Sequence, residues 1–236
     1  MKKLIKNGKK LGVIGGMGSA ASAEFLRLLA AKAPATIDQE HPVVYMIADS
    51  DLPDRSQAIL GQGPSPANQL RQDFTQLIMM GADILAVPCN TAHYFIDRFE
   101  EPLARPLIHI IEETVLAAQK INPEGAWMLS TIGTLQSGLY QEYAKKHDYR
   151  LYLPNEQQRE EIQQSIYDVK ANRLAAAGTL VKKVVLELWA ERDLPVMTAC
   201  TEIPLGYDAS GLPPARAVSS LGALADACIR ELYTSL

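Results

Sequence analysis

The chain has 236 residues, of which 47% are hydrophobic and 21% are charged; such values exclude a disordered or low-complexity protein. Its formal net charge of −4 provides no basic surface for nucleic acid or an anionic membrane, so we expect neither as a partner. No apolar stretch reaches the ~18 residues that span a bilayer, and three widely spaced cysteines are not a disulfide framework. We therefore expect a cytoplasmic protein.

Short apolar runs bounded by turn residues recur along the chain and predict buried parallel strands. In chain order they are Leu11–Gly15, Val43–Ala48, Ile84–Pro88, Leu107–Ile110, Ala126–Ser130, Arg150–Leu153 and Val196–Cys200. Amphipathic segments predict helices at Glu24–Lys32, Asn68–Met80, Gln136–His147, Gln157–Val169, Ala171–Ala190 and Leu221–Tyr233. Alternation of strands and helices predicts an α/β architecture with right-handed crossovers.

The two halves of the chain resemble each other. In each half an early strand ends in a glycine-containing turn, around Gly16 and Gly133, and a later strand ends in a cysteine, Cys89 or Cys200. The glycines are 117 residues apart and the cysteines 111. These similar offsets indicate a duplicated α/β unit; the alternative is a coincidence among several similar strands.

Cys89 and Cys200 are the strongest candidates for chemistry. Both end a predicted strand, at the edge where open α/β sheets bind ligands. Both precede residues that can start a helix, where backbone N–H groups stabilise an anion such as a thiolate. A lone free cysteine is usually a small buried hydrophobe, but two at equivalent positions favour a paired function. Cys228 lies within a predicted helix, and we expect it only to pack there.

Metal and hydrolase sites fit the sequence less well. There is no CxxC motif, and His93 is the only histidine close in sequence to Cys89 or Cys200, so we expect no metal. A Cys89–His93 pair could belong to a Cys–His hydrolase, but Cys200 would then have no role. We expect His93 to cap a helix or lie in the core.

A dinucleotide site is a further alternative. The pattern Gly16-x-Gly18-x-x-Ala21 meets the loose form of the nucleotide-binding fingerprint. The acidic residue expected about 20 positions later is misplaced, because Asp49 lies 33 residues beyond Gly16. A tight turn whose amides bind a carboxylate explains the glycines equally well.

Four segments, taken together, resemble the aspartate/glutamate racemase family, whose members need no pyridoxal phosphate. In the family's order they are Gly15–Gly18, Val87–His93, Ser130–Gln141 and Cys200–Leu205. The resemblance covers most of the chain and implies two pseudo-symmetric lobes, each a mainly parallel sheet flanked by helices, with the active site in the cleft between them. It also implies an isomerase without cofactor or metal, a small amino-acid substrate, preferably acidic, and a homodimer.

The resemblance and the repeat together predict how the lobes divide. We expect residues 1–105 and 212–236 to form the first lobe, with the Gly-Gly-Met-Gly turn, Arg55 and Cys89. Residues 106–211 are expected to form the second lobe, with the Thr131/Thr134 turn, Lys170 and Cys200.

Substrate-binding residues are carried over from matching motifs. The segments ending in Arg55-Ser56 and Lys170 resemble those that hold the substrate's side-chain carboxylate, and these two cations are 115 residues apart, close to the repeat offset. Surface charges without a ligand are the alternative for both. The expected contacts to the rest of the substrate are Met17, Gly18, Asn90, Thr91, Thr131, Thr134 and Thr201. Two residues depart from the family pattern, Ser19 in place of proline and Ala199 in place of glycine; we expect the Ala199 methyl beside the sulfur to narrow the pocket or shift substrate preference.

Racemisation takes a proton from one face of Cα and delivers another to the opposite face. Two cysteines on opposite sides of a cleft supply both groups, one as a thiolate and the other as a thiol, exchanging roles after each turnover. The sequence leaves open which cysteine acts on the L-enantiomer and whether the substrate is aspartate or glutamate. It also leaves two alternatives: a related isomerase, decarboxylase or hydantoin racemase acting on another small carboxylate, and a non-catalytic metabolite-binding protein.

Overall fold

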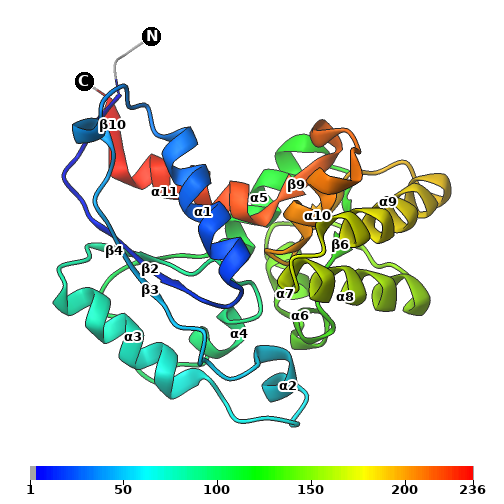
Figure 1. The fold of residues 1–236 in the computed structure, drawn as a ribbon, viewed down its shortest axis with the longest axis horizontal. Coiled ribbons are helices and arrows are strands. Elements are labelled where there is room, and N and C mark those ends of the chain that lie inside the picture. Colours follow the sequence, from blue (N-terminus) through cyan, green and yellow to red (C-terminus); the bar gives the residue numbers. More distant parts are fainter. Residues whose placement is uncertain (1–3, 236) are drawn as a thin grey trace.

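The computed structural model describes residues 4–235, so residues 1–3 and 236 of the expected first lobe lie outside the described part. Two four-stranded parallel sheets organise this part of the chain (Figure 1). The first sheet has the order β3-β2-β4-β5, with β3 at Val44–Ala48, β2 at Leu11–Gly15, β4 at Ile84–Ala86 and β5 at Leu107–Ile108. The second has the order β7-β6-β8-β9, with β7 at Leu151–Tyr152, β6 at Ala126–Leu129, β8 at Val196–Thr198 and β9 at Ala217–Ser219.

The two sheets are connected in the same way. In each, the first strand in sequence lies between the second and third, and the fourth lies outside the third. This shared topology supports the predicted duplication. The expected α/β fold with two mainly parallel sheets flanked by helices is confirmed.

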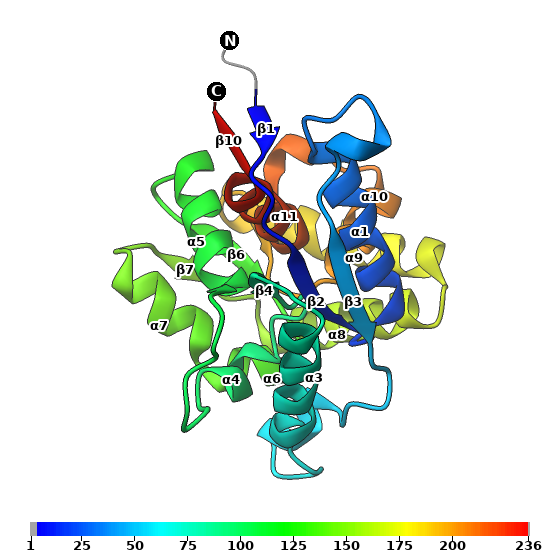
Figure 2. The ribbon, with the colours of Figure 1, turned by 90° about the vertical axis from the view of Figure 1, so that its left-hand side faces the viewer.

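Seven predicted strands form, most of them shorter than their apolar runs. The sequence missed β9, whose three residues Ala-Val-Ser contain no apolar run. It also missed a short antiparallel pair near the ends of the described chain, β1 at Leu4–Lys6 and β10 at Tyr233–Ser235 (Figure 2). Both strands of this pair mix polar and apolar residues and form only because the two chain ends meet.

The helices surround the sheets. Their bounds are α1 Ser19–Lys32, α2 Arg55–Ile59, α3 Ala67–Met79, α4 His93–Ile96, α5 Ile110–Ile121, α6 Ile132–Ser137, α7 Leu139–Lys146, α8 Glu156–Lys170, α9 Leu174–Glu191, α10 Ile203–Ser210 and α11 Ser220–Leu232. The helix predicted at Gln136–His147 is instead two helices, because Gly138 adopts a left-handed conformation between α6 and α7. The helix predicted from Ala171 begins only at Leu174, after Asn172 with a φ of 57°.

The inner strands of the two sheets, β2, β4, β6 and β8, are buried on both faces, as is usual for parallel sheets covered by helices. Leu11 and Val13 of β2 face a central core that also includes Met128 of β6, whereas Ile14 faces an outer core of the first half and Leu129 an outer core of the second. One apolar core therefore runs continuously between the two halves, and a separate core lies on the far side of each sheet.

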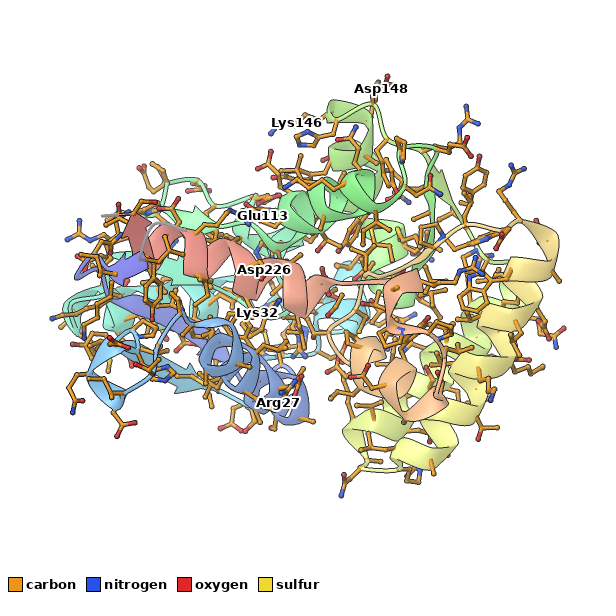
Figure 3. All side chains as sticks on the ribbon, turned by 90° about the horizontal axis from the view of Figure 1, so that it is seen from above. Arg27, Lys32, Glu113, Lys146, Asp148 and Asp226 are labelled. Atoms are coloured by element: carbon orange, nitrogen blue, oxygen red, sulfur yellow. The ribbon has the colours of Figure 1, made fainter. Side chains whose placement is uncertain are left out.

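Two helices join the halves. Helix α5 follows β5 of the first sheet but packs against α7 and β9 of the second half, and α11 follows β9 but packs against α1 and α5. Lys32 of α1 pairs with Asp226 of α11 at 2.8 Å (Figure 3), and Arg230 of α11 pairs with Glu113 of α5 at 2.6 Å. Each half therefore covers part of the other.

The last strand of each sheet lies just beyond one of the expected boundaries between the lobes. Residues 107–108 pair with β4 of the first sheet, and residues 217–219 pair with β8 of the second. Boundaries at 105/106 and 211/212 thus precede the last strand of each sheet. Within residues 4–235 no helix is both long and apolar enough to cross a membrane.

Candidate active site

Cys89 and Cys200 occupy corresponding places in the two sheets. Cys89 follows β4, and Cys200 follows β8; in chain order each of these strands is the third of its four-stranded sheet. Both cysteines are 6% exposed and line one pocket of about 310 Å³ whose walls come from both halves of the chain.

Nine of the eleven predicted site residues line this pocket. They are Met17, Arg55, Cys89, Asn90, Thr91, Thr131, Lys170, Cys200 and Thr201. Gly18 lines an adjoining cavity of about 620 Å³ together with Ser19, Arg55 and Lys170. Thr134 is 1% exposed and lies behind Thr91, whose hydroxyl it contacts at 2.8 Å.

Hydroxyl groups join the halves beside Cys89. Thr91 Oγ1 lies 2.8 Å from Thr134 Oγ1 and 3.3 Å from Thr131 Oγ1. Thr131 is also the N-cap of α6, because its Oγ1 accepts a hydrogen bond from the Thr134 backbone N–H at 3.0 Å. The turn after β6 is thereby held against the segment that follows Cys89.

Arg55 begins α2, which packs against α6 of the other half. Gly133 makes this approach possible, because a Cβ at that position would lie 2.7 Å from the Ser56 Cα. Arg55 Nη1 donates to the carbonyls of Leu52 and Pro53, both at 3.0 Å. Its backbone is held by α2 and one nitrogen by the preceding loop, so the guanidinium has a defined place at the pocket.

Lys170 ends α8 and lies exposed at the pocket rim. Desolvation alone would lower the pKa of its ammonium, but the charges of Glu202 and of the two cysteines outweigh it and raise that pKa. Lys170 therefore stays positively charged, as the binding of a carboxylate requires.

Glu202 is the site residue that the sequence interpretation missed. It is 2% exposed and lines both cavities. Its Oε2 accepts hydrogen bonds from Cys200 Sγ at 3.1 Å and Thr201 Oγ1 at 3.3 Å. The available signal was its position two residues after Cys200, which corresponds to Thr91 after Cys89. Asp54 and Ser56, which flank Arg55, also line the pocket.

Burial affects both thiols, but unequally. Desolvation raises the pKa of Cys89, while Arg55, Lys170 and a hydrogen bond from the Ala92 backbone act in the opposite direction. Desolvation and the Glu202 carboxylate raise the pKa of Cys200 well above its ordinary value. The turn amides do favour the thiolates, as predicted, but burial outweighs them in both cases.

Three other residues have structural roles. His93 is fully buried, and its Nδ1 lies 2.9 Å from the Cys89 carbonyl oxygen rather than pointing at the sulfur; the expected core role is confirmed and the hydrolase alternative loses its support. Cys228 is fully buried within α11, as predicted. Ala199, expected beside the sulfur, is buried in the central core and does not line the pocket.

A sequence model of the family described as Asp/Glu/hydantoin racemase matches residues 14–227. The chain belongs to this racemase family. The broad-specificity amino-acid racemase RacX of Bacillus subtilis (strain 168) is 24% identical over 206 residues, which cover 82% of this chain and 85% of that protein.

Solved racemase structures share the fold. An aspartate racemase of Picrophilus torridus matches with a TM-score of 0.85 and 27% identity, over 97% of this chain and 96% of that one. Glutamate racemase isoform RacE1 of Bacillus anthracis matches with a TM-score of 0.69 and 19% identity, over 96% of this chain and 82% of that one; this second likeness concerns the fold alone. The predicted family and the prediction of an isomerase are confirmed, and the racemase family acts on small amino-acid substrates.

Proposed function

We propose that this racemase interconverts the L- and D-enantiomers of an acidic amino acid, aspartate or glutamate, by proton transfer at Cα between Cys89 and Cys200. The observation that carries the proposal is the shared pocket, in which two cysteines at corresponding strand ends lie together with Arg55 and Lys170. The aspartate racemase of Picrophilus torridus, 27% identical over nearly the whole chain, supports the acidic substrate.

The two cysteines begin the reaction in different protonation states. Cys200 donates its thiol hydrogen to Glu202, so we assign it as the acid. Burial raises the pKa of Cys89, but the charges of Arg55 and Lys170 oppose this effect and favour its thiolate, so we assign Cys89 as the base. Cys89 takes the α-proton from one face, and Cys200 delivers its proton to the opposite face. This step leaves Cys89 as a thiol and Cys200 as a thiolate, the forms that convert the product back, and proton exchange with water restores the starting forms. The two thiols titrate as a coupled pair.

Stabilising the carbanion-like transition state is the harder task. A turnover of about 10 per second corresponds to a barrier of about 16 kcal/mol, and preorganised hydrogen-bond donors supply much of such stabilisation. We assign this role to groups around the α-carboxylate, from the Met17–Gly18 turn and from Asn90, Thr91, Thr131 and Thr201, with Thr134 supporting Thr91. Arg55 and Lys170 hold the distal carboxylate and orient Cα between the sulfurs; a guanidinium suits this because it can bind a carboxylate with two hydrogen bonds.

Incubation with L-aspartate or L-glutamate in deuterated water tests the proposal. Chiral chromatography and mass spectrometry should show both enantiomers, with deuterium at Cα. Cys89→Ser and Cys200→Ser should each lower racemisation at least a hundredfold, whereas Cys228→Ala, in the core, should retain most of the activity. Deuterium exchange without inversion in the unmodified protein, or near-full activity in either serine variant, would contradict the two-base scheme. No exchange with either amino acid would contradict the function itself.

The expected division into two lobes and the expected homodimer belong to the same proposal. Light scattering in solution should give twice the mass of the chain, and a monomeric mass would contradict the dimer.

A further inference from the structure

Glu202 holds one carboxylate oxygen without a partner at the centre of the site. Its Oε2 is engaged by Cys200 and Thr201, whereas its Oε1 is buried and has no hydrogen-bond partner among the described residues. Buried polar atoms are nearly always paired, and a carboxylate oxygen accepts hydrogen bonds but donates none when ionised. The unpaired atom therefore indicates a donor that arrives with a ligand.

Glu202 stands where the two cavities meet. Arg55, Lys170 and Glu202 line both the pocket with the cysteines and the adjoining cavity beside Gly18. None of the described ion pairs joins Lys170 to Glu202, so Oε1 is not neutralised by direct contact with that ammonium. Gly18 leaves space in front of Oε1, since a Cβ there would lie 2.5 Å from it.

The charges of the site are complementary to those of an acidic amino acid. Such a substrate carries two carboxylates and one ammonium, and the pocket presents two cations, Arg55 and Lys170, and two carboxylates, Asp54 and Glu202. Asp54 is exposed, and its Oδ1 caps α2 by accepting from the Gln57 backbone N–H at 2.8 Å. Glu202 thus remains as the buried acceptor for the ammonium.

The repeat strengthens this assignment. In the two halves Glu202 corresponds to Thr91, a neutral residue whose hydroxyl is taken up by Thr131 and Thr134. A pseudo-symmetric pocket must bind Cα with an ammonium on one side and a carboxylate on another. At these corresponding positions the first half has the neutral Thr91 and the second half has the acidic Glu202, so the two halves differ in charge here.

Resting on the proposed function, we infer that Glu202 is a substrate-binding residue that accepts a hydrogen bond from the substrate's α-ammonium through Oε1 while Oε2 holds the Cys200 thiol. The Glu202 side chain then holds the substrate's α-ammonium next to the Cys200 sulfur, which exchanges a proton with Cα. The site accordingly selects free α-amino acids over dicarboxylates that lack the amino group.

Binding of L-aspartate and of succinate, the same dicarboxylate without the amino group, tests the inference. Calorimetry is performed in a Cys89→Ser background, where turnover does not disturb the measurement. Adding Glu202→Gln should weaken L-aspartate binding at least tenfold, because the acceptor charge is lost. It should leave succinate binding unchanged or tighter, because a negative charge near two carboxylates is removed.

Two variants control the comparison. Asp54→Asn removes a negative charge from the same pocket and keeps a good helix cap, so it should change the affinity for both ligands in the same direction. Gly18→Ala pushes a methyl against Oε1 and should again weaken L-aspartate more than succinate. It decides the question if Glu202→Gln fails to fold.

The outcomes separate the inference from the proposed function. Equal weakening of both ligands by Glu202→Gln would overturn the inference. Unchanged affinities in the Cys89→Ser background, together with a lower kcat when Glu202→Gln is made in the protein that keeps Cys89, would also overturn it. If Glu202→Gln selectively lost aspartate binding but the unmodified protein showed no racemisation in deuterated water, the inference would be supported and the proposed function contradicted. If the Cys89→Ser protein with Glu202 intact bound neither L-aspartate nor succinate, both the inference and the proposed function would be contradicted.

Discussion

Tyr140 donates a hydrogen bond to Asn90 Oδ1 at 2.7 Å, and both side chains are buried. The bond joins α7 of the second half to the residue after Cys89 in the first. The amide of Asn90 in turn donates to Ser220 Oγ at 3.2 Å. Tyr140 and Ser220 together determine which way the amide faces, so the surroundings of Cys89 depend on residues far away in sequence.

Tyr140→Phe should destabilise the protein and reduce activity. The substitution leaves Asn90 Oδ1 buried without its donor, which costs about 1–3 kcal/mol of the free energy of unfolding, and it frees the amide beside Cys89. Urea unfolding and kcat measure the two effects. Tyr143→Phe is the control, because its ring should keep its stacking on His109; equal losses in both variants would contradict the role given to the Tyr140 hydroxyl.

Arg55→Ala should impair binding of the distal carboxylate selectively. We expect the KM for aspartate to rise at least tenfold. The KM of alanine as a substrate, or its inhibition constant if it acts only as an inhibitor, should change less than threefold. Arg55→Lys keeps the charge but not the planar fork and should give an intermediate value. If aspartate and alanine were affected equally, Arg55 would have no role in recognising that carboxylate.

His93 should make the protein less stable in mild acid. Burial lowers the pKa of this fully buried imidazole to about 3, whereas in the unfolded chain it is about 6.5. Protons therefore bind the unfolded chain preferentially, and the free energy of unfolding falls as the pH decreases from 6.5 toward 3. His93→Asn keeps an N–H donor for the Cys89 carbonyl but does not titrate, so its stability should depend less on pH.

Urea unfolding at pH 7.5, 6.0 and 5.0 measures this difference. His41→Asn, a change of the same kind outside the core, controls for the effect of a histidine-to-asparagine substitution as such. An unchanged slope in His93→Asn would show that His93 is not the group responsible.

Asp73 should make the protein more stable as the pH falls, the opposite of the effect expected for His93. It is 5% exposed on α3, with Oδ2 unpaired among the described residues, and burial and the charge of Asp49 raise its pKa to about 6. The folded state binds this proton more tightly than the unfolded chain, so stability from this group rises as the pH falls from 6 toward 4. Asp73→Asn should therefore stabilise the protein at pH 7.5, and this gain in stability should be smaller at pH 5. Thermal unfolding at both pH values measures it. A gain that is the same at both pH values, or a loss of stability at pH 7.5, would contradict the prediction.

The site residues that the sequence could predict are those that belong to a short local pattern, an apolar run or a motif. Cys89 and Cys200 each follow an apolar run, and the same runs form β4 and β8. Arg55 and Lys170 came from short motifs that keep their spacing. Glu202 carried no comparable signal, because an acidic residue near a helix start is ordinary in sequence and becomes unusual only when it is buried beside a thiol.

By itself, the sequence determined seven of the eight strands of two similar sheets, the family and the cysteine pair, because apolar runs and motifs act over a few neighbouring residues. The tertiary structure decided that β5 and β9 complete their sheets, that α5 and α11 exchange contacts between the halves, and that burial raises the pKa of both thiols. It also placed Glu202 between Cys200 and Gly18. Strand pairing, desolvation and a carboxylate's neighbours depend on contacts between separate segments of the chain. The paired residues Val196 and Ala217 are 21 positions apart, and Gly18 and Glu202 are 184 positions apart, so only the folded chain brings them together.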